Sequence, residues 1–552
     1  MNNRFFRLSN SPTCDGTPFA KLLSTPRFQF ILLLLLTLFL CTIKLDDGGL
    51  MAYDECYYAQ KSKEMVLSGD WMTQRYLGRP CHMNPWLHMW MIAASYRVFG
   101  INEWAARFPT CLQTVFIILL TYMFVQWLTR RPWVGMLAAS CLLFSDFFFK
   151  YAKKAHMDHL VTLLFLVAMT AFVAGRKRHQ KWFLVMGLAV GLSMLTKSLL
   201  GLMPLAVVAA FVIVGREWAI LKRPLFWLSI ALALAVGSSW YLYEYSRFGS
   251  DFTREHFGWQ LLSRTFIEDA DGPGASPGTF LYERIHNIYL FMRDAHIWFA
   301  LGLLGAILSF IPRRSRNDLE GIEGERLLLI LWVVVPVVLV SFTRTFKGWY
   351  LMPSYVPLAI LAAFFFSRII GSPGRLRVAA YTVLSLLFLY LAVLIVSPLF
   401  TLDLKYEIRH PGIRKLATKV RMLEPGPARV LYFPASREIA DRHGLAIDLS
   451  SYWGFALPWN FYSDHPLDAR KVRADLDEVR RQMAEHDALC LTTEEGYRVI
   501  SGDRTLPFEV VGRAVDRSMI YIVCCSRADY ARWKTIIETD HSRSPVYSLR
   551  NY

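Results

Sequence analysis

The chain has 552 residues, of which 54% are hydrophobic and only 19% are charged, and its mean hydropathy is +0.30. Such a composition is too apolar for a soluble enzyme of this size, so we expect a membrane protein. The 61 Lys and Arg residues outnumber the 44 Asp and Glu residues, for a net charge of +17. A basic surplus on an apolar chain indicates that the cationic residues lie in cytoplasmic loops and contact anionic lipid head groups. Nucleic acid is not the expected partner. Nine Cys residues without a CxxC pair argue against a disulfide scaffold or a zinc ribbon.

The first apolar run, Phe28–Leu45, follows a short basic leader. This pattern is also typical of a signal peptide. The run is close to the roughly 20 residues that span a bilayer, and Cys41-Thr42-Ile43-Lys44 offers no small-x-small cleavage site. We therefore predict an uncleaved first helix behind a cytoplasmic segment, residues 1–27.

Further apolar segments bring the prediction to about eleven spans. They are Pro109–Leu128, Trp133–Phe149, Leu160–Gly175, Trp182–Leu195, Leu199–Val214, Pro224–Tyr245, Ile297–Ile311, Leu327–Phe342, Trp349–Phe366 and Val378–Leu399. The short basic loops fall on the side of the N-terminus: Arg130-Arg131, Arg176–Lys181, Arg216–Arg223, Arg313–Arg326 and Arg368–Arg377. The positive-inside rule makes that side cytoplasmic, so an odd number of spans places everything after Leu399 outside, in the periplasm of a Gram-negative cell.

Two connections on the outer side are unusually long, and long loops are commonly functional or disordered. The first, residues 46–108, contains Tyr57–Leu67 and Trp86–Phe99, which are too short to span and suit helices lying at the membrane interface. The second, residues 246–296, carries the Gly- and Pro-rich stretch Asp271–Gly278, which predicts a mobile loop. Residues 28–400 together make the predicted transmembrane domain.

Residues 401–552 have the composition of a soluble domain. Arg429–Pro434 and Asp487–Thr493 resemble buried strands, Ala469–His486 is an amphipathic helix, and Phe508–Ser526 predicts a hairpin. Alternating strands and helices predict a small α/β domain. No Gly-rich nucleotide motif opens a helix there, so the favoured interpretation is a docking or structural cap without a cofactor.

Adjacent carboxylates, Asp54 and Glu55, follow the outer end of the first helix. Carboxylates at a membrane edge are costly unless they are solvated, paired or functional, so a solvated loop start and a catalytic site stay equally open. Asp158 begins a later span, where its carboxylate either caps the helix or takes part in chemistry.

Cations recur on the outer side, against the positive-inside rule. Lys153 and Lys154 precede Asp158, Lys197 interrupts the apolar tract Trp182–Val214 at a predicted tight turn, and Arg344 and Lys347 lie in another outer turn. A bound phosphate explains such cations, and snorkelling of Lys to the head groups is the alternative.

Histidines are scattered through the outer loops without HExxH or comparable spacing, so we expect no metal site; Glu255 and His256 are the weak candidates. In an oxidising compartment, Cys56 is able to pair with Cys81, and Cys490 with Cys524 or Cys525.

Several segments in order resemble the membrane glycosyltransferases of the GT-C fold, in the branch that contains protein O-mannosyltransferases and the lipid A aminoarabinose transferase. In the first outer loop they are Tyr53-Asp54-Glu55-x-x-Tyr58-Ala59, Ser68-Gly69-Asp70-Trp71, Arg75–Pro80, Asn84–Leu87 and Phe99–Pro109. Later matches are His156-Met157-Asp158, Leu195-Thr196-Lys197 with Gly201 and Pro204, and Lys347-x-x-Tyr350-Leu351-x-Pro353. The resemblance covers the membrane part, weakens in the C-terminal domain and implies a polytopic α-helical GT-C fold.

The chain departs from the aminoarabinose transferases at three positions. Those matching Tyr57, Met83 and Asn84 usually hold Arg, an acidic residue and Lys in that group, so phosphate- and metal-contacting groups are missing. The resemblance therefore implies a related transferase with different substrates, which moves a sugar from a polyprenyl-phosphate donor, such as undecaprenyl phosphate, to a lipid-linked or envelope glycan acceptor such as lipid A. The alternatives are a protein O-mannosyltransferase and a non-catalytic flippase of lipid-linked saccharides.

The resemblance also implies roles for the candidate residues. Cations near the departing lipid phosphate stabilise the transition state, and Lys197 and Lys347 are the first choice, with Lys153, Lys154 and Arg344 in reserve. Asp54 takes the proton of a hydroxyl acceptor or orients a phosphate acceptor, and Asp158 and Glu55 support the site. Tyr58, Arg75, Asn84 and Tyr350 are expected to bind substrate. Transfer is a single, inverting displacement by a monomer in the bacterial inner membrane, without nucleic acid and without a required metal.

Overall fold

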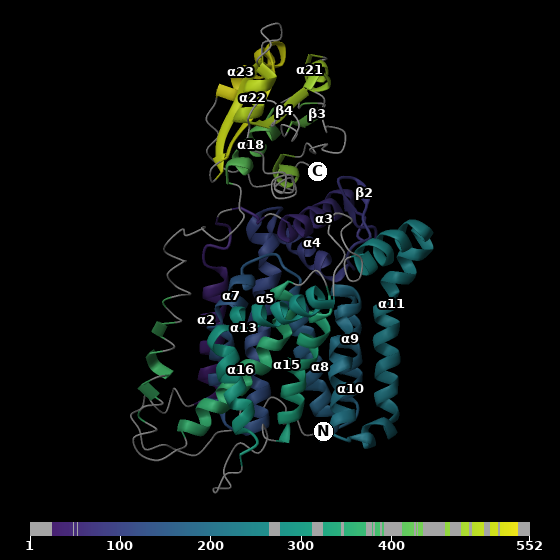
Figure 1. Cartoon of the computed structure of the whole chain (residues 1–552), viewed down its shortest axis with the longest axis vertical. Helices are drawn as coiled ribbons and strands as arrows, with labels where there is room; N and C mark the ends of the chain where they lie inside the picture. Colours follow the sequence, from purple (N-terminus) through teal and green to yellow (C-terminus); the bar gives the residue numbers. More distant parts are fainter. Residues whose placement is uncertain are drawn as a thin grey trace. The chain divides into compact units, whose positions relative to one another are not determined.

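The computed structural model describes residues 25–47, 49–51, 53–263, 277–311, 324–343, 347–370, 411–423, 427, 429–433, 459–463, 476–484, 488–501, 508–516 and 519–538, with isolated positions between 378 and 393 (Figure 1). These residues divide into two compact units. Unit 1 comprises residues 1–45, 81–91 and 107–402, and unit 2 comprises residues 46–80, 92–106 and 403–552. Each unit is described by itself.

Unit 1 is a bundle of apolar helices. They are α2 (Pro26–Thr42), α5 (Glu103–Thr129, whose first turn lies in unit 2), α6 (Pro132–Leu143), α7 (Asp146–Ala152), α8 (Asp158–Lys177), α9 (Trp182–Lys197), α10 (Met203–Val214), α11 (Pro224–Phe252), α13 (Pro277–Leu308), α15 (Arg326–Ser341) and α16 (Met352–Ile370). The short 3₁₀ helices η1 (Ser198–Leu202), η2 (Trp218–Lys222) and η4 (Gly348–Leu351) join some of them. Each predicted span overlaps one of these helices, with two exceptions: Trp133–Phe149 covers both α6 and α7, and Val378–Leu399 lies mostly outside the described residues.

Length and composition alone pick out six described helices able to cross a membrane, or seven when α6 and α7, bent by 72°, form one span. The apolar helices α2 and α15 are shorter, with 17 and 16 residues. The protein is therefore a multi-pass membrane protein.

The run from Trp182 to Val214 is a helical hairpin, as the sequence predicts. Phe172 on α8 contacts both Phe183 at the start of α9 and Phe211 at the end of α10, with ring centroids 6.2 and 5.7 Å away. Both ends of the run therefore meet the same end of α8. The turn at η1 is tight, because a Cβ added to Gly201 would lie 2.3 Å from the backbone nitrogen of Met194.

Helix α11 runs parallel to α9 and packs closely against it. Glycines let the two backbones approach: a Cβ on Gly187 would lie 2.1 Å from the carbonyl oxygen of Ser229, and one on Gly191 3.0 Å from that of Ala233. Small residues at helix contacts are the common solution in membranes, where dispersion and close packing replace the hydrophobic effect. This contact fixes α11 beside the turn that carries Lys197.

The basic loops at one end of the bundle are tied together by the carboxylate of Glu325, which is 1% exposed. It accepts Arg176 at 2.8 Å and Lys177 at 2.9 Å, and Arg176 also contacts Glu217 at 3.0 Å. The side chain of Arg223 donates to the carbonyl oxygen of Gly175 at 2.8 Å. The loops after α8, after α10 and before α15 therefore lie at the same end of the helix bundle, as the charge pattern predicts.

The second long connection is largely helical where the structure describes it, although the sequence suggests a mobile loop. Helix α11 continues to Phe252 through a kink at Gly249, and the π-helix η3 (Thr253–Ser263) follows it. Residues 264–276 lie outside the described residues, and α13 begins at Pro277 and kinks at His296. The Gly- and Pro-rich stretch Asp271–Gly278 falls almost entirely on these undescribed residues, so its mobility stays a prediction.

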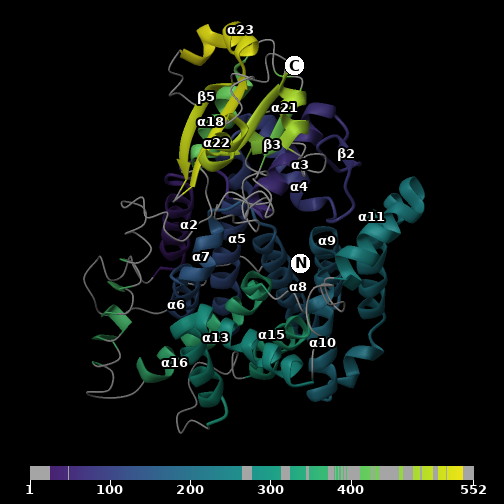
Figure 2. The same ribbon diagram turned by 45° about the horizontal axis from the view of Figure 1, so that its top comes forward.

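Unit 2 contains a four-stranded sheet in the order β3 (Arg429–Phe433), β4 (Ala488–Thr493), β6 (Met519–Ser526) and β5 (Phe508–Asp516). Strands β3 and β4 are parallel, whereas β6 is antiparallel to both β4 and β5. Helices α21 (Leu476–Ala484) and α22 (Glu494–Ser501) cover one face around Phe433, Met483 and Ile522 (Figure 2). The predicted strands and hairpin are confirmed. Helices α18 (Pro411–Arg421) and α23 (Arg527–Glu538) also pack on the sheet.

The first long connection supplies the rest of unit 2. Helix α3 (Asp54–Ser68) and the greater part of α4 (Leu87–Phe99) confirm the two predicted helices, and between them lies the hairpin of β1 (Arg75–Tyr76) and β2 (Arg79–Pro80). Leu77 and Gly78 both have positive φ, as a two-residue hairpin turn requires. The side chain of Glu103 joins this part to the C-terminal residues, since it contacts Arg414 at 2.7 Å and accepts the Tyr462 hydroxyl at 3.0 Å.

Candidate functional site

A buried carboxylate–cation group lies where α8 begins and α9 ends. Asp158 is the first residue of α8 and is 2% exposed; its Oδ1 pairs with the ammonium of Lys197, the last residue of α9. Its Oδ2 lies 2.7 Å from Nδ1 of His156. Within the described residues, no backbone N–H of the first turn of α8 donates to this carboxylate. The carboxylate is therefore used to hold Lys197 and His156, not to cap the helix.

Aromatic rings surround this group. The ammonium of Lys197 lies 3.9 Å from the ring centroid of Tyr350, within cation–π range. The His156 ring packs edge-to-face against Tyr151 and Trp349, with centroids 5.2 and 5.5 Å away. In these low-dielectric surroundings a fixed cation stabilises a nearby anion far more than it would in water.

His88 on α4 extends the group. It is fully buried, and burial, reinforced by the nearby His156, lowers its pKa to about 3. His88 is therefore neutral at ordinary pH.

The other cations predicted to bind the donor phosphate have different surroundings. The ammonium of Lys153 donates to the carbonyl oxygen of Ile43 at 2.6 Å, just past the end of α2, so it stabilises that helix terminus. Lys154 is buried, with its ammonium 4.8 Å from the Tyr151 ring centroid. Lys347 is exposed, and its ammonium lies 5.9 Å from the Trp349 ring. Arg344 lies outside the described residues.

The carboxylates of the first outer loop are in unit 2 and differ from each other. Glu55 is fully buried, and its Oε2 accepts the backbone N–H of Met51 at 2.5 Å, which holds the turn before α3. Asp54 is half-buried at the first position of α3. Tyr53 before it has φ of 69°, a conformation that non-glycine residues seldom adopt. A strained residue beside a half-buried carboxylate is common at functional sites.

The predicted substrate-binding residues fall in both units. In unit 2, Tyr58 is buried against Tyr57, and Arg75 pairs with Asp70 at 3.5 Å. In unit 1, Asn84 is half-buried, and Tyr350 lies against Lys197. The structure therefore brings Lys197, Asp158 and Tyr350 together.

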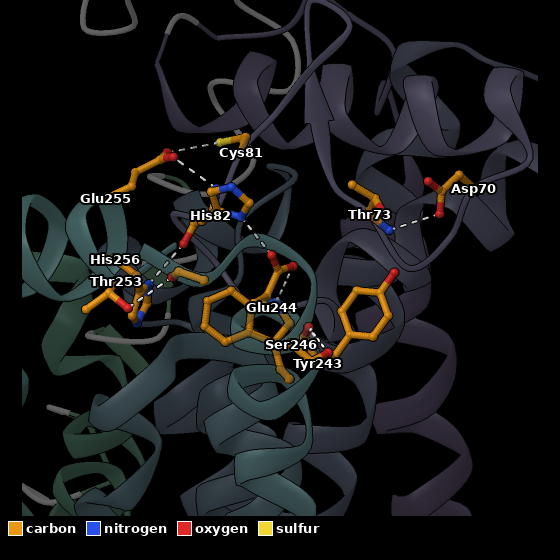
Figure 3. Close-up of polar contacts among 12 residues, drawn as sticks. Asp70, Thr73, Cys81, His82, Tyr243, Glu244, Ser246, Thr253, Glu255 and His256 are labelled. Carbon is orange, nitrogen blue, oxygen red and sulfur yellow. Dashed lines mark hydrogen bonds and ion pairs between the residues drawn. The ribbon is translucent and has the colours of Figure 1, made fainter. Parts of the chain in front are cut away.

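A second polar network in unit 1 includes His82, Glu244, Glu255 and His256 (Figure 3). It reaches Ser198, the residue after Lys197. His82 Nδ1 lies 2.7 Å from Oε2 of Glu244, whose other oxygen accepts the Trp240 indole N–H at 3.2 Å. Oε1 of Glu255 accepts the backbone N–H of His82 at 3.3 Å. His256 Nδ1 contacts the carbonyl oxygen of His82 at 3.0 Å, and its Nε2 contacts the Ser198 hydroxyl at 3.1 Å.

This network does not suit the weak metal candidates. Both ring nitrogens of His256 have hydrogen-bond partners, and Glu255 accepts a backbone N–H. Within the part of the chain that the structure describes, no group of three or more His, Cys, Asp or Glu side chains is arranged to hold a metal ion.

Sequence reasoning missed several residues of these groups. Ser198, Tyr241 and Glu244 are polar residues in apolar tracts, and an intramembrane Glu is itself a signal of function. Lys61 and Lys63 on α3 are buried, and Lys63 donates to the carbonyl oxygen of Phe461 at 2.8 Å. Their burial depends on distant segments, which periodicity does not reveal. No disulfide joins the candidate cysteines, which are Cys56, Cys81, Cys490, Cys524 and Cys525.

Comparisons with known proteins agree with this architecture. Residues 83–243 match the family model described as dolichyl-phosphate-mannose-protein mannosyltransferase. An undecaprenyl phosphate-alpha-4-amino-4-deoxy-L-arabinose arabinosyl transferase of Enterobacter sp. (strain 638) is 27% identical over 401 residues, which cover 68% of this chain and 66% of that protein. The protein of the same name from Pseudomonas aeruginosa (strain LESB58) is 30% identical over 58% of this chain and 56% of its own length. The chain thus spans less than two thirds of either relative.

The crystal structure of ArnT from Cupriavidus metallidurans bound to undecaprenyl phosphate superposes with a TM-score of 0.67 at 18% identity, covering 89% of this chain and 97% of that one. The same protein in the apo state gives a TM-score of 0.62 over the same coverage. The fold that the sequence predicts is therefore confirmed, since the chain shares the GT-C fold of that structure.

Proposed function

We propose that this GT-C chain is a glycosyltransferase of the bacterial inner membrane, which moves a sugar from a polyprenyl phosphate such as undecaprenyl phosphate to a lipid-linked or envelope glycan acceptor such as lipid A. The observation that carries the proposal is Lys197, a cation held at the end of the bundle by the buried carboxylate of Asp158. Its support is the fold, which matches a structure bound to undecaprenyl phosphate, and the names of the relatives.

In this mechanism the donor phosphate binds beside Lys197. Cleavage of the glycosidic bond leaves negative charge on the departing lipid phosphate and positive charge at the anomeric carbon, and the fixed ammonium of Lys197 stabilises the former. Asp158 keeps that ammonium in place. Exposed Lys347 supplies a second cation, and the Tyr350 ring contacts the Lys197 ammonium. Lys154 and Arg344 are further candidates for binding the phosphate.

Asp54 acts on the acceptor. It removes the proton of a hydroxyl acceptor as a general base, or orients a phosphate acceptor, which needs no base. One displacement without a covalent enzyme intermediate inverts the anomeric carbon. The reaction needs no divalent metal, and the chain works as a monomer with its C-terminal residues in the periplasm; Tyr58, Arg75 and Asn84 contact substrate.

A protein acceptor is the second candidate, because the family model that matches residues 83–243 is named for protein mannosyltransferases. Its donor chemistry is the same, since that name also describes a lipid-phosphate sugar. Only the identity of the acceptor distinguishes the two.

Mass spectrometry of lipid A, other glycolipids and envelope glycoproteins from cells with the wild-type chain and with Asp54→Asn tests both candidates. We expect one defined sugar to disappear from a lipid-linked acceptor in the variant while the protein is expressed normally. Asp251→Asn is a matched control, since Asp251 is an exposed carboxylate. Loss of sugar from a protein supports the second candidate, and unchanged lipids and proteins contradict both.

A further inference from the structure

The backbone that carries Lys197 is held in an unfavourable conformation. Ser198, the next residue, has φ of 55° and ψ of −137°. Residues with a Cβ seldom adopt such angles, which persist only where the surroundings enforce them. Lys197 thus depends on whatever holds Ser198.

Hydrogen bonds hold the Ser198 side chain on two sides. Its hydroxyl contacts the Tyr241 hydroxyl on α11 and Nε2 of His256 on η3. Because a carbonyl oxygen only accepts, Nδ1 of His256 carries the hydrogen that is donated to the carbonyl of His82. In the neutral ring Nε2 is then an acceptor, so Ser198 donates to His256 and Tyr241 donates to Ser198.

His256 is itself fixed. It is 1% exposed and packs against Phe252 in a stacked arrangement and against Trp240 edge-to-face, with ring centroids 5.5 and 4.8 Å away. The segment that it binds is anchored too, because His82 is held by Glu244 through its ring and by Glu255 through its backbone (Figure 3). The chain of contacts therefore runs from anchored residues to Ser198, and from there to Lys197.

We infer that His256 is a positioning residue for Lys197: through its hydrogen bond to Ser198, the η3 segment holds the backbone turn that aims the Lys197 ammonium at Asp158 and at the donor phosphate. The part that concerns the phosphate rests on the proposed function. The part that concerns the position of Lys197 does not, and the two are tested separately.

A double-mutant cycle tests the inference in the full-length detergent-solubilised protein. His256→Phe keeps an aromatic ring but removes both hydrogen bonds, and Ser198→Gly allows positive φ without any restraint. The first readout is the rate at which an amine-reactive reagent labels Lys197, measured by mass spectrometry. Exposed Lys347 in the same molecule is the internal control.

We expect His256→Phe to speed labelling of Lys197 about tenfold, since loss of one buried hydrogen bond changes an equilibrium by about that factor. Lys347 should be labelled at an unchanged rate. Ser198→Gly removes the same hydrogen bond and should also speed labelling of Lys197, and His256→Phe should have no further effect in that background. An unchanged rate in His256→Phe, or an equal change in both backgrounds, overturns the inference.

The second readout is binding of undecaprenyl phosphate, which we expect His256→Phe to weaken about tenfold in the wild-type background and not to weaken further in the Ser198→Gly background. A wild-type protein that does not bind the lipid contradicts the proposed function. In that case the labelling rates still decide whether His256 positions Lys197.

Discussion

A buried carboxylate lies at each end of α8, but the two have different surroundings. At its last turn, the carboxylate of Glu325 is surrounded by Arg176 and Lys177, so cations outnumber the buried anion. At its first residue, Asp158 is the buried anion for Lys197 and His156, and the Lys197 side chain keeps 12% exposure. Because α8 has 20 residues, the two ends are about 30 Å apart, near the thickness of the hydrocarbon core.

We infer that this difference separates a purely structural contact from the proposed functional site. The Glu325 group joins three loops and neutralises charge that would otherwise separate them. The Asp158 group joins only two helix ends, and it is surrounded by aromatic side chains and a strained backbone turn. Substitutions at the first group should change stability alone, whereas substitutions at the second should change activity.

The largest effect is expected for Asp158→Asn. Loss of the carboxylate releases Lys197 from its fixed position, and removal of one preorganised electrostatic group commonly lowers kcat about 100-fold or more. Transfer should be measured with purified protein and compared with Glu325→Gln, the matched carboxylate at the other end. Equal loss in both variants would show that the ends do not differ.

Glu325→Gln should mainly lower stability. It leaves Arg176 and Lys177 without their shared carboxylate, and breaking a buried ion pair costs about 3 kcal/mol or somewhat less here, since Lys177 is 40% exposed. The melting temperature in detergent should fall while the activity of the folded fraction stays near wild type. An unchanged melting temperature would contradict the structural role.

Acid should weaken the Asp158 end. The pKa of His88 is about 3 when folded and near 6.5 when unfolded, so the unfolded chain binds the proton more tightly. The contribution of neutral His88 to the free energy of unfolding is therefore complete above pH 6.5 and is lost as the pH falls toward 3. In a thermal-melt series, His88→Leu should flatten the acid side of the stability profile. The same acid loss in the variant would exclude His88 as its source.

The smallest effects concern the flanking lysines. Lys347→Ala should weaken use of the donor severalfold, because its exposed ammonium is available to an anion. Lys153→Ala should leave donor use unchanged and cost about 1 kcal/mol, the usual value of one hydrogen bond to a helix end. Initial rates over a range of donor concentrations distinguish them, and reversed effects would contradict these assignments.

Much of this architecture is readable in the sequence. Apolar length places the spans, and charge places the loops around Glu325. The motif Leu195-Thr196-Lys197 singles out the lysine that the structure places against Asp158, and the break after it predicts the tight turn. The helical second connection is not readable, because η3 depends on packing of His256 among rings of α11.

The partners of each charged group also escape sequence reasoning. Lys153 and Lys197 are both anomalous outer lysines, yet one binds the carbonyl of Ile43 and the other Asp158. Asp54 and Glu55 are adjacent, yet Glu55 is fully buried and accepts the Met51 backbone N–H, whereas Asp54 is half-buried. Such differences are set by contacts between residues distant in sequence or by the local turn, and periodicity contains neither.

Equilibrium binding of undecaprenyl phosphate to the full-length protein in lipid nanodiscs, with the wild type, Lys197→Ala and Lys222→Ala compared, tests the central claim most directly. Lys222 is an exposed lysine of η2 and is the matched control. The account predicts that Lys197→Ala binds at least about tenfold more weakly while Lys222→Ala binds like the wild type. Equal binding by all three proteins would contradict the assignment of Lys197 to the donor phosphate.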